Sequence, residues 1–284
     1  MVQESSLGRT AWRFGIGTLV TRLLARFVLG EGSERAMFYF VLKTLARSAK
    51  HRLYFVAYLS VGLGIVLVGL LEMTVHSTHG NLWAAFSRPS EALLSVPLVV
   101  SFFSLSGMRI VFGFPAELKA NWIFQIADEG DGGNCLAGVR KAMIAVAVAP
   151  VFAVIFVVYP VLWGVFTSLL TVLFGILMSL ILIEILLYSF RKIPFTCSYL
   201  PGKANLPALG ALCWVAFAIY AYSAASLEKW MLHEPVAWIV GVGVEFAILA
   251  RIVAIRNRLF ANGFNFQYED DQPPAVQSLH LDDT

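Results

Sequence analysis

Charged residues are scarce in this chain. Asp, Glu, Lys and Arg make up 14% of its 284 residues, whereas about 25% is usual for a soluble domain. Hydrophobic residues make up 58%, the mean hydropathy is +0.75, and the charges fall in clusters with long uncharged runs between them. This composition excludes a disordered chain, a collagen-like chain and a soluble globule, and it predicts an integral membrane protein.

Cysteine and catalytic motifs are also scarce. The segment around Lys203 lacks the upstream glycine of a phosphate-binding loop. The three cysteines exclude a disulfide-stapled secreted module and are too scattered for a zinc or redox motif: Cys135, Cys197 and Cys213. We therefore expect no enzyme activity, no cofactor, no metal and no nucleic-acid partner.

Six predominantly apolar segments have the length of about 20 residues that a helix needs to cross a bilayer core about 30 Å thick. They comprise residues 53–73, 92–114, 142–164, 166–190, 207–226 and 235–255. The predicted fold class is all-α, a polytopic membrane protein with six transmembrane helices in a lipid bilayer. The predicted organisation is a cytoplasmic amphipathic segment (1–52), a transmembrane domain (53–256) and a polar, disordered cytoplasmic tail (257–284).

Basic residues are distributed unevenly between the two faces of this six-span arrangement. Of the 21 Lys and Arg residues, 19 fall on one side and only Arg88 and Lys229 fall on the other. Loops rich in Lys and Arg stay in the cytoplasm. Both termini are therefore predicted to be cytoplasmic, and the protein to lie in the inner or plasma membrane.

Spans three and four are joined without a charge at residues 159–164, which predicts a tight hairpin with Tyr159 and Trp163 at the outer membrane interface. In span four, small residues recur every four positions and form a ridge that lets another backbone come close. Packing within the chain is the favoured interpretation of this ridge, and a homodimer seam is the alternative: Thr167, Thr171, Gly175 and Ser179.

Three segments outside the spans have amphipathic helical patterns. Residues 18–29 and 34–48 carry apolar and basic faces, and Ser33 is the expected N-cap of the second. Between spans two and three, residues 115–127 place polar Glu117 opposite an apolar face formed by Leu118, Trp122, Ile123 and Ile126. This helix either floats at the interface or docks a soluble partner.

Ionisable residues inside spans are costly and therefore candidates for function. The candidates for a substrate or ion path are Glu245, Glu184, Arg109 and Arg251. Glu184 lies at a depth similar to both arginines, so two arrangements are equally open: Glu184 pairs with one of them, or both arginines extend to the headgroups. Glu245 has no evident partner at its depth, so it is either protonated in a packed interface or lines a polar path, the second being slightly favoured.

The order of these parts resembles the permease subunit of ABC-2-type exporters. That resemblance implies an interfacial helix at residues 38–48, a coupling helix at 117–126, a separate nucleotide-binding ATPase subunit as partner, and two permeases forming the pathway. It is architectural, with no diagnostic motif. The outer loop expected at residues 227–234 is short for the family, and the chain contains no ATPase.

Two other functions fit the same sequence. A structural or assembly subunit of a larger membrane complex needs no catalytic residues either. A proton-coupled carrier would use Glu184 and Glu245, although no internal repeat is visible.

Overall fold

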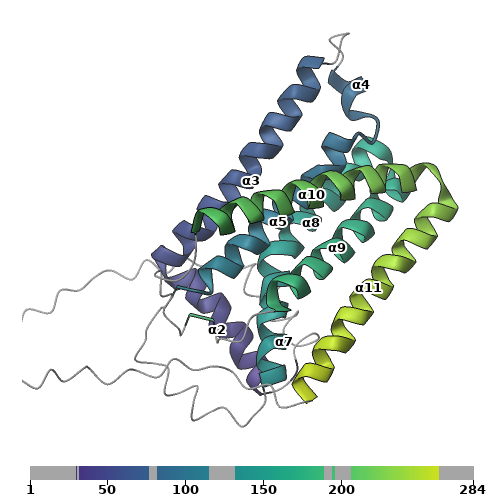
Figure 1. Cartoon of the computed structure of the whole chain (residues 1–284). Helices are drawn as coiled ribbons and strands as arrows, with labels where there is room; N and C mark the ends of the chain where they lie inside the picture. Colours follow the sequence, from purple (N-terminus) through teal and green to yellow (C-terminus); the bar gives the residue numbers. More distant parts are fainter. Residues whose placement is uncertain are drawn as a thin grey trace, which may run out of the picture.

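The computed structural model describes residues 30, 32–76, 82–114, 132–188, 194–195 and 206–261, and these ranges contain helices and no strand. Figure 1 shows them gathered in one bundle. In chain order they are α2 (Ser33–Arg47), α3 (Ala49–His76), α4 (Leu82–Phe86), α5 (Glu91–Val111), α7 (Gly132–Met143), the π-helical turn η2 (Ile144–Val148), α8 (Ala149–Trp163), α9 (Val165–Tyr188), α10 (Leu206–His233) and α11 (Pro235–Ala261).

Five of the described helices are long and apolar enough to cross a membrane, so the chain is a multi-pass helical membrane protein. They are Ala49–Val75, Glu91–Val111, Gly133–Trp163, Val165–Tyr188 and Pro235–Leu259, and they coincide with predicted spans one, two, three, four and six. The predicted fifth span lies within α10, which is not among these five. The loop expected at 227–234 is wrong, because α10 continues to His233 and only Glu234 separates it from α11.

The predicted docking segment is not among the described residues. It comprises Glu117, Leu118, Trp122, Ile123 and Ile126, all between α5 and α7. The amphipathic stretch at 18–29 and residues 262–284 of the predicted tail also lie outside the described ranges.

Helix α5 is the centre of the bundle. Of its most apolar 18 residues 72% are buried, against 6% for α3 and for α11 at the periphery. Pro97 lies inside α5. Because proline has no N–H, the carbonyl of Leu93 has no helical hydrogen-bond donor. The hydroxyl of Tyr159 on α8 donates to that carbonyl at 2.6 Å. The interfacial position predicted for Tyr159 is therefore wrong, since this side chain is 3% exposed.

The hairpin predicted between spans three and four is confirmed. Helix α8 ends at Trp163, the following Gly164 has a φ of 83° that favours glycine, and α9 begins at Val165. Trp163 is half-buried and its indole N–H donates to the Phe86 carbonyl at 2.9 Å. Between α7 and α8 the backbone forms the π-helical turn η2, which ends just before Pro150. In a regular α-helix the ring of Pro150 would clash with the carbonyl four residues earlier.

Glycines and other small residues let neighbouring helices approach closely. A Cβ atom at Gly62 of α3 would lie 2.9 Å from the Cβ of Phe103 on α5, and one at Gly107 of α5 would lie 2.8 Å from the Cβ of Tyr58. In the ridge of α9, a Cβ at Gly175 would lie 2.5 Å from the Phe152 ring of α8. At this position the ridge packs within the chain, as the sequence favoured.

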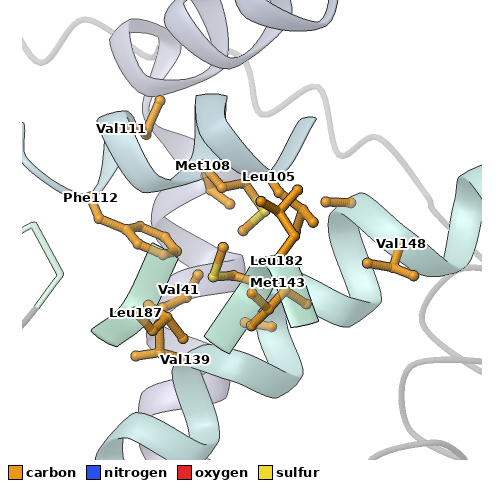
Figure 2. Close-up of a cluster of buried hydrophobic side chains, with 14 of the residues drawn as sticks. Val41, Leu105, Met108, Val111, Phe112, Val139, Met143, Val148, Leu182 and Leu187 are labelled. Atoms are coloured by element: carbon orange, nitrogen blue, oxygen red, sulfur yellow. The ribbon is translucent and has the colours of Figure 1, made fainter. Parts of the chain in front are cut away.

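Helix α2 packs against α7. A Cβ at Gly138 of α7 would lie 2.3 Å from the backbone oxygen of Glu34, so the two backbones nearly touch. The predicted N-cap is wrong by one residue: Gly32 is the cap and Ser33 begins the helix. Side chains from α2, α5, α7 and α9 meet in one buried apolar cluster (Figure 2), which includes Val41, Met108, Val139, Met143, Leu182 and Leu187.

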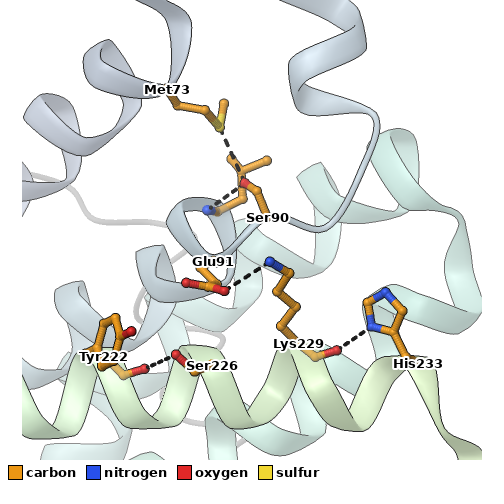
Figure 3. Close-up of polar contacts among 8 residues, drawn as sticks. Met73, Ser90, Glu91, Tyr222, Ser226, Lys229 and His233 are labelled. Carbon is orange, nitrogen blue, oxygen red and sulfur yellow. Dashed lines mark hydrogen bonds and ion pairs between the residues drawn. The ribbon is translucent and has the colours of Figure 1, made fainter. Parts of the chain in front are cut away.

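Polar contacts define the two ends of the bundle. At the end that carries α4, here called the α4 end, the Ser90 hydroxyl donates to the Met73 sulfur at 3.4 Å and Lys229 pairs with Glu91 at 3.0 Å (Figure 3). At the opposite end, here called the α2 end, buried His51 contacts the Ser48 hydroxyl at 2.5 Å and the Phe114 carbonyl at 3.0 Å.

Candidate functional site

Buried carboxyl groups fall into two sets in the interior of the described bundle. The buried glutamates are Glu34, Glu184, Glu228 and Glu245, with exposed fractions of 8%, 4%, 1% and 5%. The first two lie at the α2 end and have cationic partners. The other two lie between α9, α10 and α11 and have none among the described residues. Since a buried charge is costly without a partner, this difference separates two kinds of site.

The paired set is centred on Glu184 of α9 and is called the arginine cluster: Glu184, Arg140 and Arg256. Arg140 Nε of α7 lies 3.0 Å from Glu184 Oε1. Nη1 of Arg256, on α11, lies 2.7 and 2.6 Å from the two carboxylate oxygens. One carboxylate therefore holds three helices together.

The expected partners of Glu184 were Arg109 and Arg251, and the structure places both elsewhere. Arg109 Nε donates to the Leu186 carbonyl at 3.0 Å, near the end of α9. Arg251 is exposed on α11. The sequence missed Arg140 and Arg256 because they fall outside or at the limit of the predicted spans, whereas α7 begins at Gly132 and α11 continues to Ala261.

A second ion pair lies next to the arginine cluster. Lys141, which follows Arg140 on α7, pairs with Glu34 of α2, and the same carboxylate accepts from the Gly30 backbone N–H at 3.2 Å. The α2 end is therefore rich in paired charges, and α2 is fixed to α7 by polar contact as well as by apolar packing.

The unpaired set is called the acidic row: Tyr220 and Glu228 of α10 and Glu245 of α11. The two carboxyl groups lie within electrostatic range of each other, and the Tyr220 hydroxyl lies within range of both. The Thr171 hydroxyl of α9 lies beside Glu228, but none of the four carboxyl oxygens has a hydrogen-bond partner among the described residues. The hydroxyls of Thr171 and Tyr220 are also buried and without a partner in that part of the chain.

The surroundings of the acidic row are apolar and aromatic. Tyr159 of α8 lies within electrostatic range of Glu228, and the buried indole N–H of Trp238 on α11 has no partner among the described residues. A Cβ at Gly241 would lie 2.4 Å from Met231 Cε, so α10 and α11 are in close contact here. The adjacent buried cluster consists of Leu94, Leu98, Phe174, Ala224, Ala225 and Met231.

Two carboxylates buried on adjoining helices cannot both remain ionised in such surroundings without compensation. An isolated ionised carboxylate in an apolar medium is neutralised rather than tolerated, and two like charges at one site disfavour each other. The acidic row must therefore take up protons or hold a small cation. Metal-binding geometry is not evident, because the described residues contain no group of three or more His, Cys, Asp or Glu side chains that could hold an ion.

Comparisons with known proteins identify no relative. No protein-family model matches the chain, and no curated protein or solved structure is significantly similar to it. The buried polar residues described above are therefore the basis for proposing a function.

The sequence singles out Glu245 but not Glu228. Glu228 falls in the outer loop expected at residues 227–234, beyond the predicted fifth span. A usable signal was present: Tyr220, Ala224 and Glu228 are spaced four residues apart and share one face of a helix.

Proposed function

We propose that this protein is a membrane carrier coupled to protons, with Glu228 and Glu245 as its proton-binding groups. The single observation that carries the proposal is the acidic row: two buried carboxyl groups on the adjoining helices α10 and α11, with no cationic or hydrogen-bonding partner among the described residues. Ionisable groups within membrane spans mark proton relays in pumps and transporters.

A purely structural role would require different chemistry. Structural buried carboxylates are paired or hydrogen-bonded, as Glu184 is with Arg140 and Arg256. In the acidic row, hydroxyl groups lie next to the carboxyl groups instead, at Tyr220 and Thr171. A hydroxyl can donate and accept, so this row suits proton exchange better than permanent charge.

The carrier is proposed to have six spans, with α10 as the additional crossing. Ring contacts support this: Trp214 lies 5.9 Å from Phe103, and Tyr220 lies 5.6 Å from Phe102 between ring centroids. Lys229 reaches Glu91 at the start of α5. Helix α10 thus runs antiparallel to α5 over most of its length. Under the charge rule the α2 end is cytoplasmic.

Proton flux into proteoliposomes tests the proposal. Purified protein is reconstituted with a pH-sensitive dye inside, and a pH gradient is imposed across the bilayer. We expect flux above that of empty liposomes for the wild type, and loss of that excess for Glu245→Gln and Glu228→Gln. Glu234→Gln is the matched control, because Glu234 is exposed between α10 and α11. Wild-type flux equal to that of empty liposomes contradicts the proposal.

An exporter permease subunit is the second candidate. The observation that favours it is positional: α5 ends near Phe114, which contacts His51 at the α2 end, and α7 begins again at the same end beside α2. A docking helix at 117–126 would thus connect two helix ends on the proposed cytoplasmic face. Copurification tests it: a tagged chain should bring down an ATPase, and scrambling residues 117–126 should abolish this.

A further inference from the structure

We infer that α11 is the moving helix of this protein and that the ion pair between Arg256 and Glu184 is a gate that closes the acidic row at the α2 end. This inference rests on the proposed function, because it assigns the access route to the proton-binding groups. Three observations support it: the packing of α11, the position of two largely buried polar side chains on one face of α11, and the two arginines that lie beside Glu184.

Helix α11 is attached sparsely. Only 6% of its most apolar 18 residues are buried, and large apolar side chains such as Val236, Ile239 and Phe246 are exposed. It packs on α9 and α10, where Trp238 and Val242 contact a buried apolar cluster and Gly241 approaches Met231, and its last turns are held by Arg256 on Glu184. By contrast α5 is held on several sides. A helix with few buried contacts is the element that moves most readily.

Two largely buried polar side chains of α11 are aligned along the helix. Glu245 and Arg256 are eleven residues apart, which is about three helical turns and therefore the same face. Both side chains point into the bundle: Glu245 is 5% exposed and the Arg256 side chain 16% exposed. When Arg256 separates from Glu184, the α2-end half of this face moves away from α9, and Glu245 becomes open to water from that end.

The arginine cluster is built so that it can open without leaving an unpaired buried anion. Glu184 has two guanidinium partners, and Arg140 stays beside it at 3.0 Å when Arg256 leaves. The released Arg256 lies in the last part of α11, six residues before Asn262, where its long side chain can extend to water or headgroups. Closed and open states are thus both compensated, as a two-state gate requires.

Carboxyl labelling in membrane vesicles tests this gate. A water-soluble carbodiimide and an amine nucleophile are added to the face that carries the C-terminus, identified by a tag after Thr284, and modification of Glu245 and Glu228 is measured by mass spectrometry. We expect labelling to rise about tenfold in Arg256→Gln, because removing one partner of a buried pair shifts an opening equilibrium by at least that factor. Arg256→Lys, which keeps the charge but loses the guanidinium group, should rise by less.

Two matched variants distinguish opening of the gate from a general destabilisation of the helix bundle. Arg140→Gln removes the other guanidinium but keeps the contact of Arg256 Nη1 with both oxygens of Glu184, so its labelling should stay near that of the wild type. Arg258→Gln changes an exposed arginine of the same helix and should have no effect. Equal labelling in Arg256→Gln and wild type, or equal increases in Arg256→Gln, Arg140→Gln and Arg258→Gln, would overturn the gate.

This result is distinguishable from failure of the proposed function. Absence of wild-type proton flux in liposomes contradicts proton carriage itself. Normal wild-type flux with labelling that does not respond to Arg256 contradicts only the gate, and leaves the acidic row as a site with another access route.

Discussion

Two sets of buried carboxyl groups lie in this bundle, and they differ in how their negative charge is compensated. Glu184 has two arginines within 3.0 Å and fixes three helices. Glu228 and Glu245 are also buried, but they lie on the adjoining helices α10 and α11 with no cationic partner among the described residues. The difference teaches that burial alone does not mark a functional acid. The partner does: a carboxylate with a cationic partner can stay ionised and hold helices together, whereas one without such a partner is neutralised by a proton.

The largest expected effect is loss of the compensated carboxylate. Glu184→Ala leaves the guanidinium groups of Arg140 and Arg256 in the interior without their anion, so we expect destabilisation of about 3–5 kcal/mol. Thermal unfolding of the purified protein in detergent measures it, with Glu234→Ala as the control. A loss no larger than that of the control would remove the distinction between the two sets.

The next largest effect is expected where α7, the helix that carries Arg140, packs against α2. Gly138→Ala introduces a methyl group 2.3 Å from the Glu34 backbone oxygen, and backbone cannot move aside as a flexible side chain can. We expect destabilisation of about 2 kcal/mol from overpacking. Gly133→Ala, at a position of the same helix with nothing within 4 Å, is the control in the same unfolding experiment. Equal stability of the two variants would show that α2 and α7 are not in close contact.

A smaller effect is expected beside the acidic row. Tyr159→Phe removes the donor that replaces the missing N–H of Pro97, and an unsatisfied buried carbonyl costs about 1–3 kcal/mol. Pro97→Ala should reduce this loss in the double variant, because alanine restores the helical N–H to Leu93. Tyr222→Phe, at a side chain 74% exposed, is the control. Additive effects of Tyr159→Phe and Pro97→Ala in a double-mutant cycle would contradict the compensation.

Removing an acid from the acidic row should affect stability still less. Glu228→Gln keeps the side-chain shape and removes a carboxyl group that has no hydrogen-bond partner among the described residues, so we expect the free energy of unfolding to change by less than about 1 kcal/mol. The measurement is the same thermal unfolding, set against Glu184→Gln, which should be clearly destabilised. Comparable losses in both variants would mean that Glu228 has a compensating partner.

The smallest effect is expected at the exposed ion pair of the α4 end. Lys229→Ala breaks a contact of 3.0 Å with Glu91 between side chains that are 42% and 46% exposed. Surface pairs contribute about 0–1 kcal/mol, so unfolding should shift by no more than that and less in high salt. A loss as large as that of Glu184→Ala would show that exposure does not rank these ion pairs.

Much of the fold could be predicted from sequence because bilayer thickness sets helix length. Five predicted spans coincide with described helices, and the hairpin at Gly164 follows from an uncharged junction. The end of α10 could not be predicted this way, because Glu228 and Lys229 resemble a loop by charge although both are helical. The partners of Glu184 were missed for a related reason: hydropathy sets depth along a helix but not which face turns toward which neighbour, and Arg140 and Arg256 meet Glu184 only through helix packing.

The most direct test of the central claim is the infrared absorption of protonated carboxyl groups at neutral pH, compared between the wild type and three single variants. The acidic row is predicted to contain a protonated carboxyl, so the carbonyl band should lose intensity in Glu228→Gln and in Glu245→Gln, and should persist unchanged in Glu184→Gln, whose acid is ionised against two arginines. A spectrum in which neither row variant alters the band, or in which only Glu184→Gln does, would contradict the account.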